Sequence, residues 1–188
     1  MKRDSFSQLT PPSKALMSCA NELSRLHSWP ILDAGCGAGR NAVALALTGL
    51  SVVCVDRDID RLLALSDIAP RYIASIKPPR NVVGKLYPIC ADLDELQWPF
   101  SPSQFSAITC VHFLKIGLLD LFWSALVVSG YLFIETFGGH GKNYLDLPKS
   151  GQLREQLSGR FNISFYQERK VGPVGYDAVS VKLLAQKQ

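Results

Sequence analysis

The stretch Ile31-Leu-Asp-Ala-Gly-Cys-Gly-Ala-Gly-Arg-Asn41 decides the fold of this chain, together with Ser51-Val-Val-Cys-Val-Asp56 that follows it. An apolar strand leads into a loop with glycine at every second position, then a helix, then a second apolar strand that ends in a carboxylate. Glycine permits a positive φ and lets the backbone approach a ligand where any Cβ would collide. A carboxylate at the end of the second strand is placed to accept hydrogen bonds from ribose hydroxyls. The pattern therefore predicts a site for a nucleoside-containing ligand.

Strands and helices alternate along the chain up to about residue 160. Apolar runs predict strands over 31–34, 51–55, 86–91, 105–113 and 131–137, and helices over 13–27, 40–48, 58–68, 118–127 and 150–157. The segments 161–168 and 178–185 predict a terminal hairpin. Such alternation implies a parallel sheet with helices on both faces, which binds ligands at the carboxyl ends of its strands. We expect one doubly wound, Rossmann-like α/β domain over residues 1–188, with 1–30 as an N-terminal cap and 31–188 as the core.

The composition narrows the classes of function. The net charge is +4, but the basic residues are scattered and do not favour nucleic acid. No uninterrupted apolar run reaches the roughly 18 residues of a membrane span. The N-terminus lacks the apolar stretch of a secretory signal, which predicts a cytoplasmic protein without membrane association. The five cysteines form no Cys-x-x-Cys pair and the three histidines lie far apart, so we expect reduced thiols and no metal site.

The spacing of the glycines distinguishes two kinds of nucleoside cofactor. A dinucleotide fingerprint reads Gly-x-Gly-x-x-Gly/Ala, and Arg40 stands here at its last small position. Asp33 precedes the loop and can attract a cation such as the methionine ammonium of S-adenosylmethionine, whereas it would not help a pyrophosphate. Asp92 follows the third strand and can accept from an adenine amine, while Leu93 can pack against the ring. These residues favour S-adenosylmethionine over a nicotinamide or flavin cofactor.

The chain resembles the class I S-adenosylmethionine-dependent methyltransferases over nearly its full length. The matching segments are Gly35-Cys-Gly-Ala-Gly-Arg-Asn41, Val55-Asp-Arg-Asp58 and Ala91-Asp-Leu93. It looks most like the small tellurite-resistance and thiopurine-type branch, through Leu147-Pro-Lys-Ser-Gly-Gln-Leu-Arg154 and Tyr166-Gln-Glu168. The resemblance implies a seven-stranded, mostly parallel sheet of order 3-2-1-4-5-7-6 with strand 7 antiparallel. The turn over 171–176 lacks the His-Arg pair expected of tellurite enzymes, a departure that disfavours oxyanion chemistry.

The resemblance also implies roles for single residues. Asp33 and the glycine loop would hold the methionine portion, Asp56 the ribose and Asp92 the adenine. The predicted cofactor-binding residues are Asp33, Gly35, Cys36, Gly37, Gly39, Asp56, Arg57, Asp92 and Leu93. We predict an enzyme that transfers a methyl group from S-adenosylmethionine to a small-molecule acceptor, with a soft S, Se or Te nucleophile as one acceptor class. The alternatives are an RNA or protein methyltransferase and a non-catalytic scaffold that binds S-adenosylmethionine.

The candidate acceptor contacts lie at the ends of the fourth and fifth strands. His112 can act as a general base for an amine or hydroxyl, although a histidine in an apolar strand is also a common core residue. Glu135 ends the fifth strand at the same mouth and is the second catalytic candidate. Arg40, His140 and Tyr144 are candidate substrate contacts, the last two in a glycine-rich loop. No Asn-Pro-Pro-Tyr segment follows the fourth strand, which disfavours methylation of planar amino groups.

Overall fold

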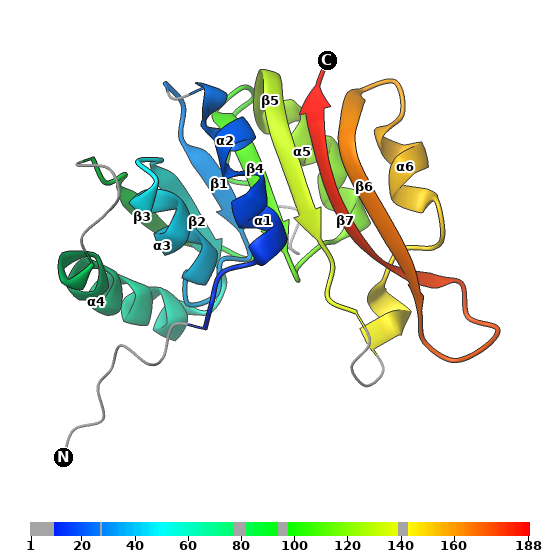
Figure 1. The fold of residues 1–188 in the computed structure, drawn as a ribbon, viewed down its shortest axis with the longest axis horizontal. Coiled ribbons are helices and arrows are strands. Elements are labelled where there is room, and N and C mark those ends of the chain that lie inside the picture. Colours follow the sequence, from blue (N-terminus) through cyan, green and yellow to red (C-terminus); the bar gives the residue numbers. More distant parts are fainter. Residues whose placement is uncertain (1–9, 27, 77–81, 94–97, 139–142) are drawn as a thin grey trace.

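A seven-stranded sheet forms the centre of the molecule in the computed structural model (Figure 1). The structure describes residues 10–26, 28–76, 82–93, 98–138 and 143–188. The strands are β1 (Ile31–Ala34), β2 (Val52–Asp56), β3 (Leu86–Cys90), β4 (Phe105–Val111), β5 (Leu126–Glu135), β6 (Phe161–Val171) and β7 (Ala178–Lys187). Their order is β3-β2-β1-β4-β5-β7-β6, and β7 is antiparallel to both of its neighbours while the other pairs are parallel. The predicted α/β fold, strand order and direction of the seventh strand are confirmed.

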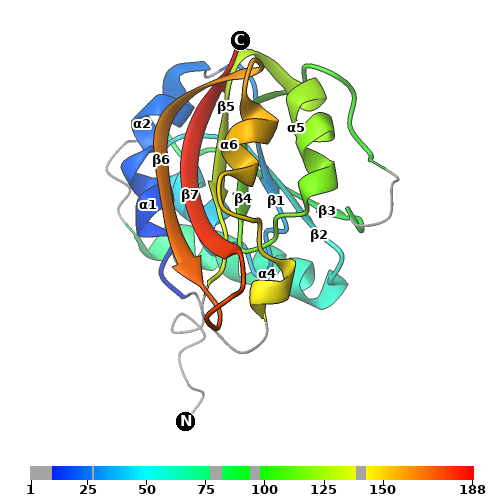
Figure 2. The ribbon, with the colours of Figure 1, turned by 90° about the vertical axis from the view of Figure 1, so that its right-hand side faces the viewer.

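Helices cover both faces of the sheet. They are α1 (Lys14–Ser18), α2 (Ala20–Leu23), η2 (Ser24–Leu26), α3 (Arg40–Leu47), α4 (Ile59–Ser75), η3 (Ile116–Leu118), α5 (Leu119–Ala125), η4 (Asn143–Asp146) and α6 (Gln152–Leu157). One buried cluster joins the sheet to α1 through α4, with Leu16, Leu45 and Leu65 among its members. The opposite cluster takes Phe122 from α5 and Leu153 from α6. Figure 2 shows α1 and α2 on one side of the strands and α5 and α6 on the other.

The alternation of side chains along β1 places a carboxylate inside the protein. Leu32 and Ala34 belong to the cluster on the α5 and α6 side, whereas Ile31 belongs to the cluster on the α1 to α4 side. Because successive strand residues face opposite ways, Asp33 shares the side of Ile31. Its Cα partner on the neighbouring strand is Thr109. The fold thus buries Asp33 on the face that α3 covers.

The boundaries of three elements differ from the sequence prediction. Helix α4 continues through Pro70 to Ser75, where the sequence predicts an end at Ile68. Proline costs one helical hydrogen bond, but Leu65 and Ala69 are buried against the sheet and this tertiary packing holds the helix together. The predicted helix over 13–27 is interrupted at Cys19, and β5 begins at Leu126 because that residue pairs with β4.

Within the described ranges, no helix is both long and apolar enough to cross a bilayer. The same residues contain no group of three or more His, Cys, Asp or Glu side chains that could hold a metal ion. All five cysteines are free thiols, and only Cys90 is exposed.

Candidate functional site

The loop over residues 35–39 connects β1 to α3, and close contacts require two of its glycines. A Cβ on Gly35 would collide with the ring of Phe113, and a Cβ on Gly39 would collide with the side chain of Leu65. Both glycines have positive φ values, 70° and 78°, which L side chains rarely adopt. The sequence pattern predicts that these glycines make room for a ligand. The structure adds that they also admit the side chains that pack against the loop.

Asp33 lies beneath this loop and is 1% exposed. The Thr109 hydroxyl donates a hydrogen bond of 2.9 Å to Oδ1 of Asp33, while Oδ2 has no hydrogen-bond partner among the described residues. Burial raises the pKa of Asp33 to about 7, against the lowering effects of the Thr109 hydrogen bond and the Arg40 charge. A buried carboxylate with an unpaired oxygen is costly unless a ligand completes it. The chemistry of this oxygen fits a cationic group such as an ammonium.

Asp56 ties the end of β2 to the glycine loop. Its Oδ2 accepts a hydrogen bond of 2.7 Å from the backbone N–H of Gly37, and its Oδ1 accepts one of 3.0 Å from the N–H of Asp58. Each carboxylate oxygen has a second lone pair, so both can still accept from a ligand hydroxyl. Asp56 therefore shapes the loop and also faces the cavity beside it.

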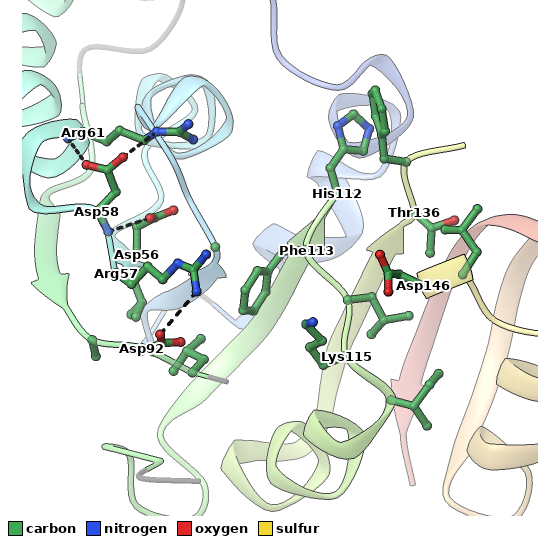
Figure 3. A pocket seen from close by; sticks show the side chains of 18 of the residues that line it. Asp56, Arg57, Asp58, Arg61, Asp92, His112, Phe113, Lys115, Thr136 and Asp146 are labelled. Atoms are coloured by element: carbon green, nitrogen blue, oxygen red, sulfur yellow. Dashed lines mark hydrogen bonds and ion pairs between the residues drawn. The ribbon is translucent and has the colours of Figure 1, made fainter. Parts of the chain in front are cut away.

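The larger cavity, of about 520 Å³, lies at the carboxyl ends of the strands. On one side are Asp56, Arg57 and Asp92, and Arg57 lies 3.5 Å from the Asp92 carboxylate. On the opposite side are Thr136 and Asp146 (Figure 3). The ring of Phe113 lies between these two groups (Figure 3). The cavity therefore has one half that Asp56, Arg57 and Asp92 line and a second half beyond Phe113.

A second cavity of about 430 Å³ lies over the glycine loop. It is lined by Thr10, Gly35, Cys36, Gly37, Ala38, Arg40, Asn41, Arg61, Val111, His112 and Phe137. Gly35, Arg61, His112 and Phe137 also line the first cavity, so the two cavities meet at these residues. The site is thus continuous from Asp92 at one end to Arg40 at the other.

His112 stands where the two cavities meet. Its φ of 62° turns the chain sharply after β4, and its N–H donates a 2.7 Å hydrogen bond to the carbonyl of Glu135. The imidazole packs edge-on against Phe137, with 4.7 Å between ring centroids. Partial burial lowers the pKa of His112, although the Glu135 charge acts in the opposite direction. The ring is therefore a neutral acceptor near neutral pH.

Comparison with known proteins shows similarity to methyltransferases. The family model described as tellurite resistance protein TehB matches residues 9–90. An S-adenosylmethionine-dependent methyltransferase from Methanosarcina mazei superposes with a TM-score of 0.63 at 20% identity, covering 84% of this chain and 92% of that one. The chain has the class I methyltransferase fold.

Two further structures share this methyltransferase fold. Magnesium protoporphyrin IX methyltransferase from Synechocystis PCC 6803, with bound S-adenosylmethionine, has a TM-score of 0.64 at 16% identity and covers 93% of this chain and 77% of that one. TehB from Haemophilus influenzae has a TM-score of 0.64 at 15% identity, and the match covers 94% of this chain and 64% of that one. No curated protein matches the sequence. The predicted resemblance to class I methyltransferases, the tellurite-resistance type included, is confirmed.

The methyltransferase fold brings most of the predicted cofactor-binding residues together. Those that line the two cavities are Gly35, Cys36, Gly37, Asp56, Arg57, Asp92 and Leu93. Asp33, beneath the loop, and Gly39, its last residue, line neither cavity. Arg40 lines the second cavity, and its Nη1 donates a 3.1 Å hydrogen bond to the carbonyl of Pro11.

The other residues predicted to contact the acceptor do not line either cavity or lie outside the described residues. Glu135 lines neither cavity, because the Ser13 hydroxyl donates to its Oε2 and Lys182 forms a 3.2 Å ion pair with its Oε1. Tyr144 also lies outside both cavities and packs edge-on against Tyr176 at a centroid distance of 4.8 Å. His140 lies outside the described residues.

Sequence reasoning missed several residues that line the site. They are Thr10, Arg61, Phe113, Lys115, Phe137 and Asp146. For Phe113 and Phe137 a signal existed, since each follows the carboxyl end of a parallel strand, where this type of sheet binds ligands. Thr10 and Asp146 carried no such signal, because their segments reach the site only through tertiary packing.

Proposed function

We propose that this protein is an S-adenosylmethionine-dependent methyltransferase that acts on a small molecule. The observation that carries the proposal is the unpaired, buried oxygen of Asp33 beneath the glycine loop. An ammonium group would satisfy that oxygen, and S-adenosylmethionine carries one at its methionine end. The neighbouring cavities supply contacts for the rest of such a molecule.

The proposed cofactor would occupy both cavities, and different residues would hold each of its parts. Asp92 and Leu93 would hold the adenine and Asp56 the ribose hydroxyls in the larger cavity. The glycine loop would hold the amino-acid end in the second cavity, where the Arg40 guanidinium complements a carboxylate. When bound, the cofactor supplies an electrophilic methyl group on a sulfonium. The residues shared by both cavities would then surround that methyl group.

His112 would contribute proton acceptance to the reaction. Its neutral imidazole lines both cavities, so it can reach an acceptor placed beside the methyl group. A general base must lie within hydrogen-bond reach of the proton that it removes and have a pKa below the working pH. An acceptor that is already an anion, such as a thiolate or a selenide, would need only alignment by the cavity walls.

The shape of the larger cavity favours a small acceptor. Beyond Phe113, the remaining half is walled by Thr136, Phe137, Asp146, Leu147 and Pro148. Part of the about 520 Å³ would be taken by the nucleoside, which leaves room for a compact molecule. A soft S, Se or Te nucleophile remains the acceptor class that we propose first.

Two measurements test this proposal. Calorimetry should detect binding of S-adenosylmethionine and of S-adenosylhomocysteine but not of NAD. Incubation with cofactor and a panel of small thiols, selenols, amines and phenols should then give one product heavier by one methyl group. Tight NAD binding without S-adenosylmethionine binding would refute the proposal. Cofactor binding without turnover on small molecules would favour a scaffold, and methylation of RNA or protein would identify the other alternative.

A further inference from the structure

The segment over residues 10–13 reaches the site from outside the sheet. Figure 1 shows the chain leading to α1 past the carboxyl ends of β1 and β2. Thr10 lines the cavity over the glycine loop, together with loop residues such as Gly37. Nothing in the strand and loop pattern requires this segment to lie there. Its position must come from the contacts of its own residues.

Ser13 makes the contacts that fix this segment. Its N–H donates a 2.9 Å hydrogen bond to Oδ1 of Asn41, the second residue of α3. Its hydroxyl donates to Oε2 of Glu135 at the end of β5 and accepts a 3.1 Å bond from the N–H of Leu16, as the N-cap of α1. Ser13 and Asn41 are 7% and 5% exposed, so water does not replace these bonds readily.

Glu135 is itself held in place by other strands. Lys182 on β7 forms an ion pair of 3.2 Å with Oε1 of Glu135, and the Glu135 side chain is 12% exposed. Its carbonyl accepts the N–H of His112. A hydrogen bond from Ser13 to this carboxylate is charge-assisted, which makes it stronger than a bond between neutral groups. Ser13 thus joins the helix after the glycine loop to the strand end beside His112.

We propose that Ser13 is a positioning residue that holds residues 10–13 as a wall of the amino-acid end of the cofactor site, acting through Glu135 and Asn41. The inference rests on the proposed function and assigns Glu135 to the cofactor side rather than to acceptor chemistry. Arg40 completes the wall, since it lies in the same cavity and donates to the Pro11 carbonyl. Loss of the Ser13 bonds would loosen the wall and leave the nucleoside half intact.

Two probes distinguish this role from a general effect on folding. S-adenosylhomocysteine occupies both halves of the proposed site, whereas 5′-methylthioadenosine has the nucleoside and no amino-acid end. By calorimetry, Ser13→Ala should weaken S-adenosylhomocysteine binding about 10-fold and change the affinity for 5′-methylthioadenosine by less than about twofold. Glu135→Gln should give the same pattern, while a base acting only on the acceptor would leave both affinities unchanged.

Rescue and control variants complete the test. Ser13→Thr retains the hydroxyl and should restore S-adenosylhomocysteine binding. Ser24→Ala removes a hydroxyl that donates a 2.8 Å hydrogen bond to the carbonyl of Asn21 and should change neither affinity. Equal losses for both probes, or no loss for either, in Ser13→Ala would overturn the inference while wild-type binding upheld the proposed function. Failure of the wild-type protein to bind either probe would instead overturn the proposed function, and the inference with it.

Discussion

Replacing Asp33 by asparagine removes a charge that the fold buries and the proposed cofactor needs. Stability and binding should therefore change in opposite directions. Asparagine retains an oxygen that can accept the 2.9 Å hydrogen bond from Thr109. The variant thus tests the charge with little change in shape.

The pKa of Asp33 sets the size of the effect. Burial raises it from 3.8 to about 7, which at ~1.36 kcal/mol per pKa unit corresponds to about 4 kcal/mol. The folded carboxyl holds its proton more tightly than the unfolded one. The contribution of Asp33 to the free energy of unfolding should therefore be highest below about pH 4, fall as pH rises toward about 7, and stay level above. An unpaired Nδ2 group in the variant costs about 1–3 kcal/mol, so we expect a net gain of about 1–3 kcal/mol at about pH 8.

Urea unfolding without cofactor, at about pH 5 and about pH 8, measures this gain. The advantage of Asp33→Asn should shrink at the lower pH, because the wild-type carboxyl is then protonated. Calorimetry should show S-adenosylhomocysteine binding weakened about 100-fold or more, since one partner of a buried charge pair is lost. Asp67→Asn, at a side chain that is 61% exposed, is the matched control and should change neither quantity. An advantage of Asp33→Asn that is as large at about pH 5 as at about pH 8 would refute the reasoning.

Four further variants probe the loop and the reacting end. Asp56→Ala should lower the melting temperature by roughly 4–8 °C and weaken cofactor binding, because two backbone N–H groups lose their acceptor; unchanged melting in scanning calorimetry would contradict this. Gly39→Ala should cost about 2–4 kcal/mol in urea unfolding and Gly37→Ala about 1–2 kcal/mol, because only the first also collides with Leu65; equal losses would show that the collision is relieved. Turnover of the wild type should fall only on the acid side of the ordinary histidine range, because burial lowers the pKa of His112, and His112→Gln should reduce kcat about 100-fold and remove that pH limb; a limb above neutral pH would point to another base.

Local patterns predicted the framework of the fold. The nearly all-apolar run of β4 is buried at every residue, and the alternation of strands and helices gives the parallel part of the sheet. The predicted end of α4 was wrong. A proline lowers helix propensity locally, whereas Leu65 and Ala69 stabilise the helix by packing against the sheet, which the local sequence does not reveal. The interruption at Cys19 was likewise not visible in the spacing of apolar residues.

The sequence by itself determined which residues stand at the carboxyl ends of the strands, because strand period and glycine spacing are local properties of the chain. Asp33, Asp56 and Asp92 follow from that alone. Only the tertiary structure decided which contacts those positions make. Ser13 meets Glu135, and Phe113 packs on Gly35, across long stretches of chain. Partners so far apart are chosen by the packing of helices on the sheet, and no periodicity in the sequence encodes that choice.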